Sequence, residues 1–158
     1  MKTVVSASAE ETMTLGRRIG EAILQLPALF SIALTGDLGA GKTCLIQGLA
    51  KGLGVDEGYY ITSPTFNIIN EYPAGVKRLC HLDLYRLGAP DELEYIGFED
   101  LLGEDAVVAV EWPDLLREDG FVFNLELRFE FDKDFNRIIR IIPSGQQGTN
   151  LLSTLSLP

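Results

Sequence analysis

The sequence has few of the side chains that usually bind transition metals or form disulfides. It contains one histidine, His81, and two cysteines, Cys44 and Cys80. The cysteines show neither a metal-type nor a Cys-x-x-Cys spacing, so we expect both to be reduced and to behave as small apolar residues. A single histidine excludes a His-rich metal site. We interpret His81, within an apolar strand pattern, as structural.

Long hydrophobic runs are also missing. No apolar stretch approaches the roughly 20 residues that a membrane-spanning helix requires. The first residues, Met1 to Ser6, lack the hydrophobic core of a signal peptide. We therefore expect a cytoplasmic protein that does not contact a membrane.

Basic residues are scarce relative to acidic ones, at 13 against 23, which gives a net charge of −10. Proteins that bind DNA or RNA strongly usually carry a basic face, and no cluster of Lys or Arg occurs here. The charge therefore argues against strong direct nucleic-acid binding. It remains compatible with docking on a basic protein partner.

What the sequence does contain is a complete phosphate-binding pattern, G-x-x-x-x-G-K-[ST]. The pattern follows an apolar run at 29–34 and precedes a segment with helical spacing at 44–50, which is the strand, loop and helix order that it requires. We therefore predict that this segment binds a nucleotide. The alternative is a glycine-rich turn that matches the pattern by chance. The residues are Gly36, Asp37, Leu38, Gly39, Ala40, Gly41, Lys42 and Thr43.

The chemistry of phosphate binding explains these residue types. Gly39 and Gly41 can adopt positive φ, which lets consecutive backbone N–H groups form a concave anion site. The helix that follows adds the positive end of its dipole. Lys42 can reach the β- and γ-phosphates of a nucleotide, and the Thr43 hydroxyl can bind Mg²⁺.

Two apolar strand patterns each end in an acid, at Asp83 after 79–82 and at Glu111 after 106–110. This arrangement is typical of enzymes that place a carboxylate beside the Mg²⁺ of a phosphate loop. We assign Asp83 to the metal shell, directly or through water, while Glu111 could orient the attacking water or bind Mg²⁺. Ordinary strand-end carboxylates are the alternative. The predicted catalytic residues are Lys42, Asp83 and Glu111, and the predicted metal ligands are Thr43, Asp83 and Glu111.

Two further segments have less specific patterns. The polar stretch Thr62 to Phe66 has hydroxyls that could line a phosphate site, although a plain loop is the simpler interpretation. Trp112 follows Glu111 directly. It is either a half-buried packing residue or an anchor that contacts a partner.

The order of patterns predicts an α/β fold, namely one three-layer P-loop NTPase-like domain at residues 1–145. We expect a mixed sheet with a parallel centre and antiparallel hairpins. Residues 146–158 are expected to form a mobile tail. The expected elements are an edge strand at 2–5, a helix from a Ser8/Glu11 capping box to Pro27, a helix at 42–53, a hairpin of 67–72 and 76–82 with its turn at 73–75, a helix from Pro90 to 102, and a hairpin of 125–131 and 138–142.

Four motifs in this order resemble the TsaE family, formerly YjeE, of bacterial ATPases in tRNA threonylcarbamoyladenosine (t6A) biosynthesis. The resemblance covers Ser8 to about Ile142. The motifs are the 36–43 phosphate loop, Ser63-Pro64-Thr65-Phe66, His81-Leu82-Asp83-Leu84-Tyr85-Arg86 and Glu111-Trp112-Pro113.

The resemblance implies an ATPase that uses ATP and Mg²⁺ and works with the TsaB and TsaD proteins to place threonylcarbamoyl on adenosine 37 of tRNA. It also implies that Thr43 and Glu111 bind Mg²⁺, with Asp83 at or near the shell, and that 63–66 and Trp112 belong to nucleotide-sensing switches. Cys44 stands where the family usually has a second Thr, and we expect it to face the helix packing. The predicted nucleotide-binding set consists of residues 36–43 with Thr12, Cys44, Thr65 and Arg137.

Three functions remain open. The first is an ATPase that is slow alone and stimulated by partners, since no arginine finger is evident beyond Arg86. The second is a nucleotide-gated docking module with little essential turnover. The third is a small P-loop kinase, which the scattered arginines disfavour. Binding of GTP is not expected because no N-K-x-D motif occurs.

Overall fold

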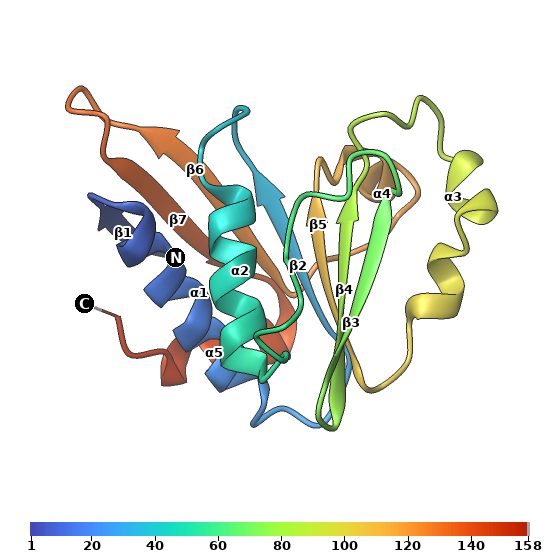
Figure 1. Ribbon diagram of the computed structural model, residues 1–158, viewed down its shortest axis with the longest axis horizontal. Helices are drawn as coiled ribbons and strands as arrows, with labels where there is room; N and C mark the ends of the chain where they lie inside the picture. The colour runs from blue at the N-terminus through green and yellow to red at the C-terminus, as the bar shows by residue number, and fades with distance from the viewer. Residues whose placement is uncertain (158) are drawn as a thin grey trace.

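A seven-stranded mixed sheet forms the middle layer of the computed structural model, which describes residues 1–157 (Figure 1). The strand order is β1-β7-β6-β2-β5-β4-β3. All seven strands belong to this one sheet. The strands are β1 (Lys2–Ser6), β2 (Phe30–Thr35), β3 (Ile69–Ala74), β4 (Lys77–Asp83), β5 (Ala106–Glu111), β6 (Leu125–Phe131) and β7 (Arg137–Pro143).

The centre of the sheet is parallel and its edges are antiparallel, as the sequence predicted. Strands β6, β2, β5 and β4 run parallel to one another. The β3/β4 and β6/β7 hairpins and the β1/β7 pair are antiparallel. Every residue of β5 is buried, because a central parallel strand is covered on both faces.

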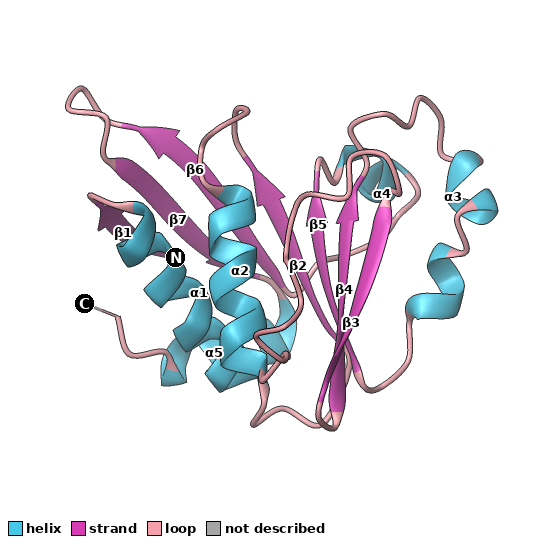
Figure 2. Ribbon diagram, in the orientation of Figure 1, coloured by secondary structure: helices cyan, strands magenta, loops and turns pink. Residues whose placement is uncertain are grey.

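Helices cover both faces of the sheet (Figure 2). One apolar core joins the sheet to α1 (Ala9–Ile23), α2 (Lys42–Leu53) and α5 (Gly145–Thr154). A second core, on the other face, joins it to α3 (Glu92–Tyr95), the 3₁₀ helix η1 (Phe98–Leu101) and α4 (Asp114–Glu118). The predicted three-layer arrangement is confirmed. None of the helices in residues 1–157 has the length and apolar character needed to cross a membrane.

Helix α1 begins at the predicted capping box. The Ser8 hydroxyl accepts a hydrogen bond from the Glu11 amide at 3.1 Å, and the Glu11 carboxylate accepts one from the Ala7 amide at 2.7 Å. The helix ends at Ile23 instead of continuing to Pro27.

Helices α1 and α2 pack at unusually close range through glycines. A Cβ on Gly16 would lie 2.1 Å from the Leu45 carbonyl oxygen, and one on Gly48 would lie 1.9 Å from that of Met13. Gly20 and Gly52 make equivalent approaches. The contact fixes α2, and with it the phosphate loop, against the N-terminal part of the chain.

The prediction of one continuous helix from Pro90 to 102 is wrong. The segment forms α3 and η1, separated by Gly97 with a φ of 71°, because a left-handed residue ends an α-helix. The first hairpin turns at Gly75 and Val76 rather than at 73–75. Helix α4 had no predicted counterpart.

The expected mobile tail is also wrong for most of its length. Helix α5 buries Leu151 and Leu152, and Leu155 behind it, in the core that includes α1 and α2. The Lys2 ammonium donates to the Leu152 carbonyl at 2.9 Å. Pro158 lies outside the described residues. Apolar spacing at 151, 152 and 155 was the signal in the sequence, and the Gly, Gln and Ser residues before it obscured that signal.

Candidate functional site

The phosphate loop connects β2 to α2 with the backbone that its glycines allow. Gly36, Gly39 and Gly41 have φ values of 145°, 79° and 106°. The positive φ expected for Gly39 and Gly41 is confirmed. Gly41 is also the N-cap of α2, so the backbone N–H groups at the start of this helix face the loop. The loop has the features of an anion site.

Lys42 bends back over this loop. Its ammonium donates to the carbonyl oxygen of Gly36 and lies 3.5 Å from that of Asp37. It also lies 4.3 Å from the ring centre of Trp112, a cation–π contact. Burial lowers the pKa of Lys42, while the negative charge of Glu111 and Asp83 opposes this shift. The side chain thus places a nearly buried cation between the loop and the acids.

The two strand-end acids, Asp83 and Glu111, meet as the sequence predicted. They are register partners on the parallel strands β4 and β5. Both are buried, at 5% and 4% exposure. Side chains alternate along a strand, so they share the face that carries Leu79 and α2. The Thr43 hydroxyl lies 3.5 Å from Glu111 Oε1. The three predicted metal ligands therefore lie at one point, the N-terminus of α2.

The polar segment before β3 folds onto both acids. The Ser63 hydroxyl oxygen is 2.6 Å from Asp83 Oδ2 and 3.2 Å from Glu111 Oε2. Thr65 Oγ1 lies 3.5 Å from the same Asp83 oxygen. Thr65 was in the predicted nucleotide-binding set, whereas Ser63 was not. The Ser63-Pro64 pair in the motif was the signal that could have identified Ser63.

His81 is fully buried, and its Nε2 lies 2.7 Å from Glu111 Oε2. An imidazole that carries its proton on Nε2 would donate this hydrogen bond to the Glu111 carboxylate. Nδ1 is buried and has no hydrogen-bond partner among residues 1–157. The structural interpretation of His81 overlooked this contact with a predicted catalytic residue. The other acid, Asp83, accepts a hydrogen bond at Oδ1 from the backbone N–H of Tyr85, at 3.0 Å.

Strained backbone flanks the acids on both sides. Trp112 has a φ of 57° and Ile68 a φ of 69°, which are uncommon for side chains of these sizes. The Trp112 ring packs on Tyr85 at 5.0 Å between centroids. Strain of this kind gathers at binding and switch segments, where the surrounding structure maintains it.

Three predicted nucleotide contacts lie farther from the acids. The Arg137 Nε donates to the Ala40 carbonyl at 3.1 Å, so this side chain packs against the loop backbone at Ala40 and Gly41. Cys44 Sγ lies 3.1 Å from the Ala9 carbonyl and faces α1, as expected. Thr12 is buried, and its hydroxyl contacts Ser6 Oγ at 2.7 Å and the Ser8 carbonyl at 3.2 Å.

The donor set suits Mg²⁺ bound jointly with phosphates. Within residues 1–157, no group of three or more His, Cys, Asp or Glu side chains is arranged to hold a metal ion. Mg²⁺ is usually bound by one or two carboxylates together with substrate phosphates and water. Thr43, Asp83 and Glu111 provide one hydroxyl and two carboxylates of this kind.

Comparisons with known proteins identify a family and several similar chains. The family profile described as "Threonylcarbamoyl adenosine biosynthesis protein TsaE" matches residues 6–139. The chain is 33% identical over 147 residues to the tRNA threonylcarbamoyladenosine biosynthesis protein TsaE of Haemophilus influenzae, which covers 89% of each chain. It is 37% identical over 141 residues to that of Bacillus subtilis, covering 86% of this chain and 87% of the relative. The crystal structure of Bacillus subtilis YdiB superposes with a TM-score of 0.76 at 29% identity, covering 98% of this chain and 93% of that one.

Proposed function

The chain belongs to the TsaE family of tRNA threonylcarbamoyladenosine biosynthesis proteins, and we propose that it serves this pathway as a Mg²⁺-dependent ATPase. Its nucleotide site would support the transfer of threonylcarbamoyl to adenosine 37 of tRNA. The observation that carries the proposal is the convergence of Asp83 and Glu111 with Thr43 directly beside a complete phosphate loop.

Each side chain of the site has a chemical task in this proposal. Thr43, Asp83 and Glu111 would hold Mg²⁺, which neutralises charge on the phosphates when it is bound. Lys42 would exchange the Gly36 carbonyl for phosphate oxygens, because a buried ammonium gains most from a charged acceptor. In the alternative assignment, Glu111 orients the attacking water while Thr43 and Asp83 hold Mg²⁺.

The switch segments connect this site to the protein surface. Ser63 contacts both acids. Phe66, three residues later, is 81% exposed, and the Arg86 guanidinium lies 4.2 Å from the centre of the Phe66 ring. A change at the acids would therefore alter an exposed aromatic surface. We propose that this surface reports nucleotide state to the TsaB and TsaD proteins in the cytoplasm, and that tRNA is contacted through them.

A hydrolysis assay with the full chain tests the proposal. Phosphate release from ATP should require Mg²⁺, should be slow for the protein alone and should increase when TsaB and TsaD are added. The Lys42→Ala variant should lose the stimulated rate. Release no faster than that of Lys42→Ala, with and without TsaB and TsaD, would refute the ATPase assignment.

A nucleotide-gated docking function is the second candidate, favoured by the strained Trp112 and by the contact of Ser63 with both acids. The Glu111→Gln variant separates the two functions. If turnover is essential, this variant should bind ATP but fail to support t6A formation. Normal t6A formation without hydrolysis would favour gating by ATP binding alone.

A further inference from the structure

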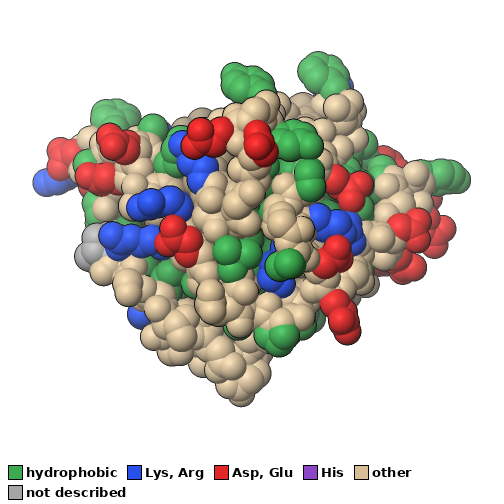
Figure 3. All heavy atoms as spheres, turned by 60° about the horizontal axis from the view of Figure 1, so that its bottom comes forward, with side chains coloured by type: hydrophobic (Ala, Val, Ile, Leu, Met, Phe, Trp, Pro, Cys, Tyr) green, Lys and Arg blue, Asp and Glu red, His purple; other side chains and the backbone are tan. Residues whose placement is uncertain are grey.

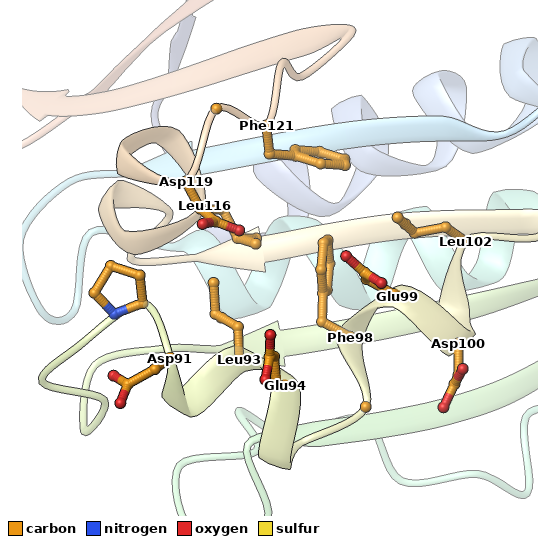
Figure 4. A pocket seen from close by; sticks show the side chains of 13 residues that line it. Asp91, Leu93, Glu94, Phe98, Glu99, Asp100, Leu102, Leu116, Asp119 and Phe121 are labelled. Atoms are coloured by element: carbon orange, nitrogen blue, oxygen red, sulfur yellow. The ribbon is translucent and has the colours of Figure 1, made fainter.

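A groove on the face of the sheet opposite α1 and α2 has no part in the nucleotide site. It has a volume of about 690 Å³ and lies between α3, η1, α4 and the 120–121 segment (Figure 4). The volume is within the range of pockets that accept a drug-sized ligand or several protein side chains. None of its lining residues belongs to the phosphate loop, the strand-end acids or the switch segments.

The floor of the groove is apolar. Leu93, Phe98 and Leu116 form its base, with exposures of 4%, 5% and 1%. The half-buried Leu102 and Phe121 extend the apolar surface towards solvent. Figure 4 shows Leu93 beside Glu94 and Phe98 beside Glu99, whereas Phe121 stands apart from the labelled carboxylates. The apolar surface open to a ligand therefore comes mainly from Leu102 and Phe121, since the three residues of the base are almost fully covered.

The rim is acidic. Five exposed carboxylates line the groove, and no Lys or Arg does. In the part of the chain that the structure describes, none of the five takes part in an ion pair. Arg117, on neighbouring α4, pairs instead with Asp114 and Glu126. The five are Asp91, Glu94, Glu99, Asp100 and Asp119.

Acidic side chains gather at this end of the molecule. Figure 3 shows acidic and hydrophobic side chains, without basic ones, at the outer end where α3 and η1 lie. Like charges at this density repel one another and create a local negative potential. A ligand that brings positive charge would relieve the repulsion, whereas the phosphates of a nucleic acid would add to it.

We propose that this groove docks a basic amphipathic segment of a partner protein, with Lys or Arg on the acidic rim and apolar side chains on the floor. The charge complementarity selects a cationic partner, and the apolar floor selects a segment that also carries Leu-type side chains. The surface would act independently of nucleotide, because it shares no residue with the nucleotide site. The chain would then have two separate contact regions for proteins.

A labelled peptide tests the proposal on the full chain. The probe has roughly 12 residues, with Leu at helical i, i+3, i+4 and i+7 spacing and Lys at the remaining positions. Fluorescence anisotropy should show binding that weakens with salt. The Glu94→Lys/Glu99→Lys variant should weaken it by about tenfold or more. The control Glu10→Lys/Glu21→Lys reverses two exposed charges on α1 and should change affinity less than about threefold.

Three further measurements distinguish the groove from general electrostatics. Leu102→Ala should weaken peptide binding without preventing folding, since Leu102 is only half-buried. A peptide with Ser in place of Leu should bind much less well. The Lys42→Ala variant should bind the peptide normally, so failure of the ATPase assignment would not affect this test.

Several outcomes would overturn the docking proposal. Absence of peptide binding would do so, as would equal losses in the two charge-reversal variants. Equal binding of the Ser peptide would show diffuse attraction instead of docking. Displacement of the peptide by equimolar spermine would indicate a site for small organic cations.

Discussion

Asp83 and Glu111 are register partners at the ends of β4 and β5, and the single hydroxyl of Ser63 contacts both carboxylates, at 2.6 and 3.2 Å. The pairing follows from the parallel centre of the sheet, which brings the carboxyl ends of neighbouring strands to one edge. Two buried carboxylates this close are costly unless hydrogen bonds or cations compensate. Ser63, His81 and Lys42 supply that compensation.

Removal of the Ser63 hydroxyl should therefore slow ATP hydrolysis. We expect Ser63→Ala to reduce the rate by about tenfold or more, because the acids lose the donor that fixes their orientation. The exposed neighbour Thr62 provides the control, and Thr62→Ala should change the rate less than about twofold. Steady-state phosphate release measures both, and equal rates in the two variants would contradict the positioning role of Ser63.

Trp112 should report nucleotide binding through its contact with Lys42. The chain has a single tryptophan, and the Lys42 ammonium lies 4.3 Å from its ring centre. If Lys42 moves to the phosphates of ATP, this cation–π contact is lost and the tryptophan fluorescence should change. Lys51→Ala, on the exposed part of α2, should keep the response. Unchanged fluorescence while calorimetry shows ATP binding would refute the movement of Lys42.

The close approach of α1 and α2 should make Gly48 intolerant of a methyl group. Gly48→Ala would place a Cβ 1.9 Å from the Met13 carbonyl oxygen. Overpacking of about 3 kcal/mol outweighs the gain of about 1 kcal/mol in helix propensity, so the free energy of unfolding should fall by about 2 kcal/mol. Urea denaturation measures the change.

Gly88→Ala is the matched control for this prediction. A Cβ at Gly88 would lie 3.6 Å from the nearest atom, Glu92 Oε1, which is an ordinary contact. Its stability should differ from that of the wild type by less than about 0.5 kcal/mol. A Gly48→Ala variant as stable as Gly88→Ala would disprove the tight helix contact.

Cys80 should make stability depend on pH in the alkaline range. Burial raises the pKa of its thiol from 9.0 to about 11, against the opposing charge of Arg78. The folded state therefore keeps the proton that the unfolded state releases. The resulting stabilisation is fully present below about pH 9 and is lost as the pH rises to about 11.

The size of this effect should reach about 2 kcal/mol in the free energy of unfolding between about pH 8 and about pH 10.5. Cys80→Ala should lack this part of the pH dependence, and Cys44→Ala should retain it. Urea denaturation at both pH values measures the difference. Parallel pH profiles for the wild type and Cys80→Ala would contradict the raised pKa.

Local chemistry made much of the fold predictable. The phosphate loop needs glycines at 39 and 41, and the continuous apolar pattern of 106–110 suits a strand that is buried on both faces. The alternation of apolar and polar residues at 125–131 is typical of a strand with one buried face, and it predicted the β6/β7 hairpin. Elements with strong periodicity or specific backbone demands were therefore recognised.

Other features depend on contacts that are distant in sequence. Helix α5 forms a core with α1 and the sheet, and its short apolar set at 151, 152 and 155 is meaningful only with those partners in place. The contacts of Ser63 and His81 with Glu111 span 48 and 30 residues. Their chemistry could be suspected from the motifs, but their partners depend on strand order and register.

The level of t6A in cellular tRNA tests the central claim most directly. Cells depleted of the protein should lose t6A, and the wild-type gene should restore it. The Lys42→Ala variant, at equal abundance, should fail to restore t6A because its phosphate loop lacks the cation that contacts ATP. Full restoration by Lys42→Ala would contradict the role of the loop, and unchanged t6A after depletion would contradict the place of this protein in the pathway.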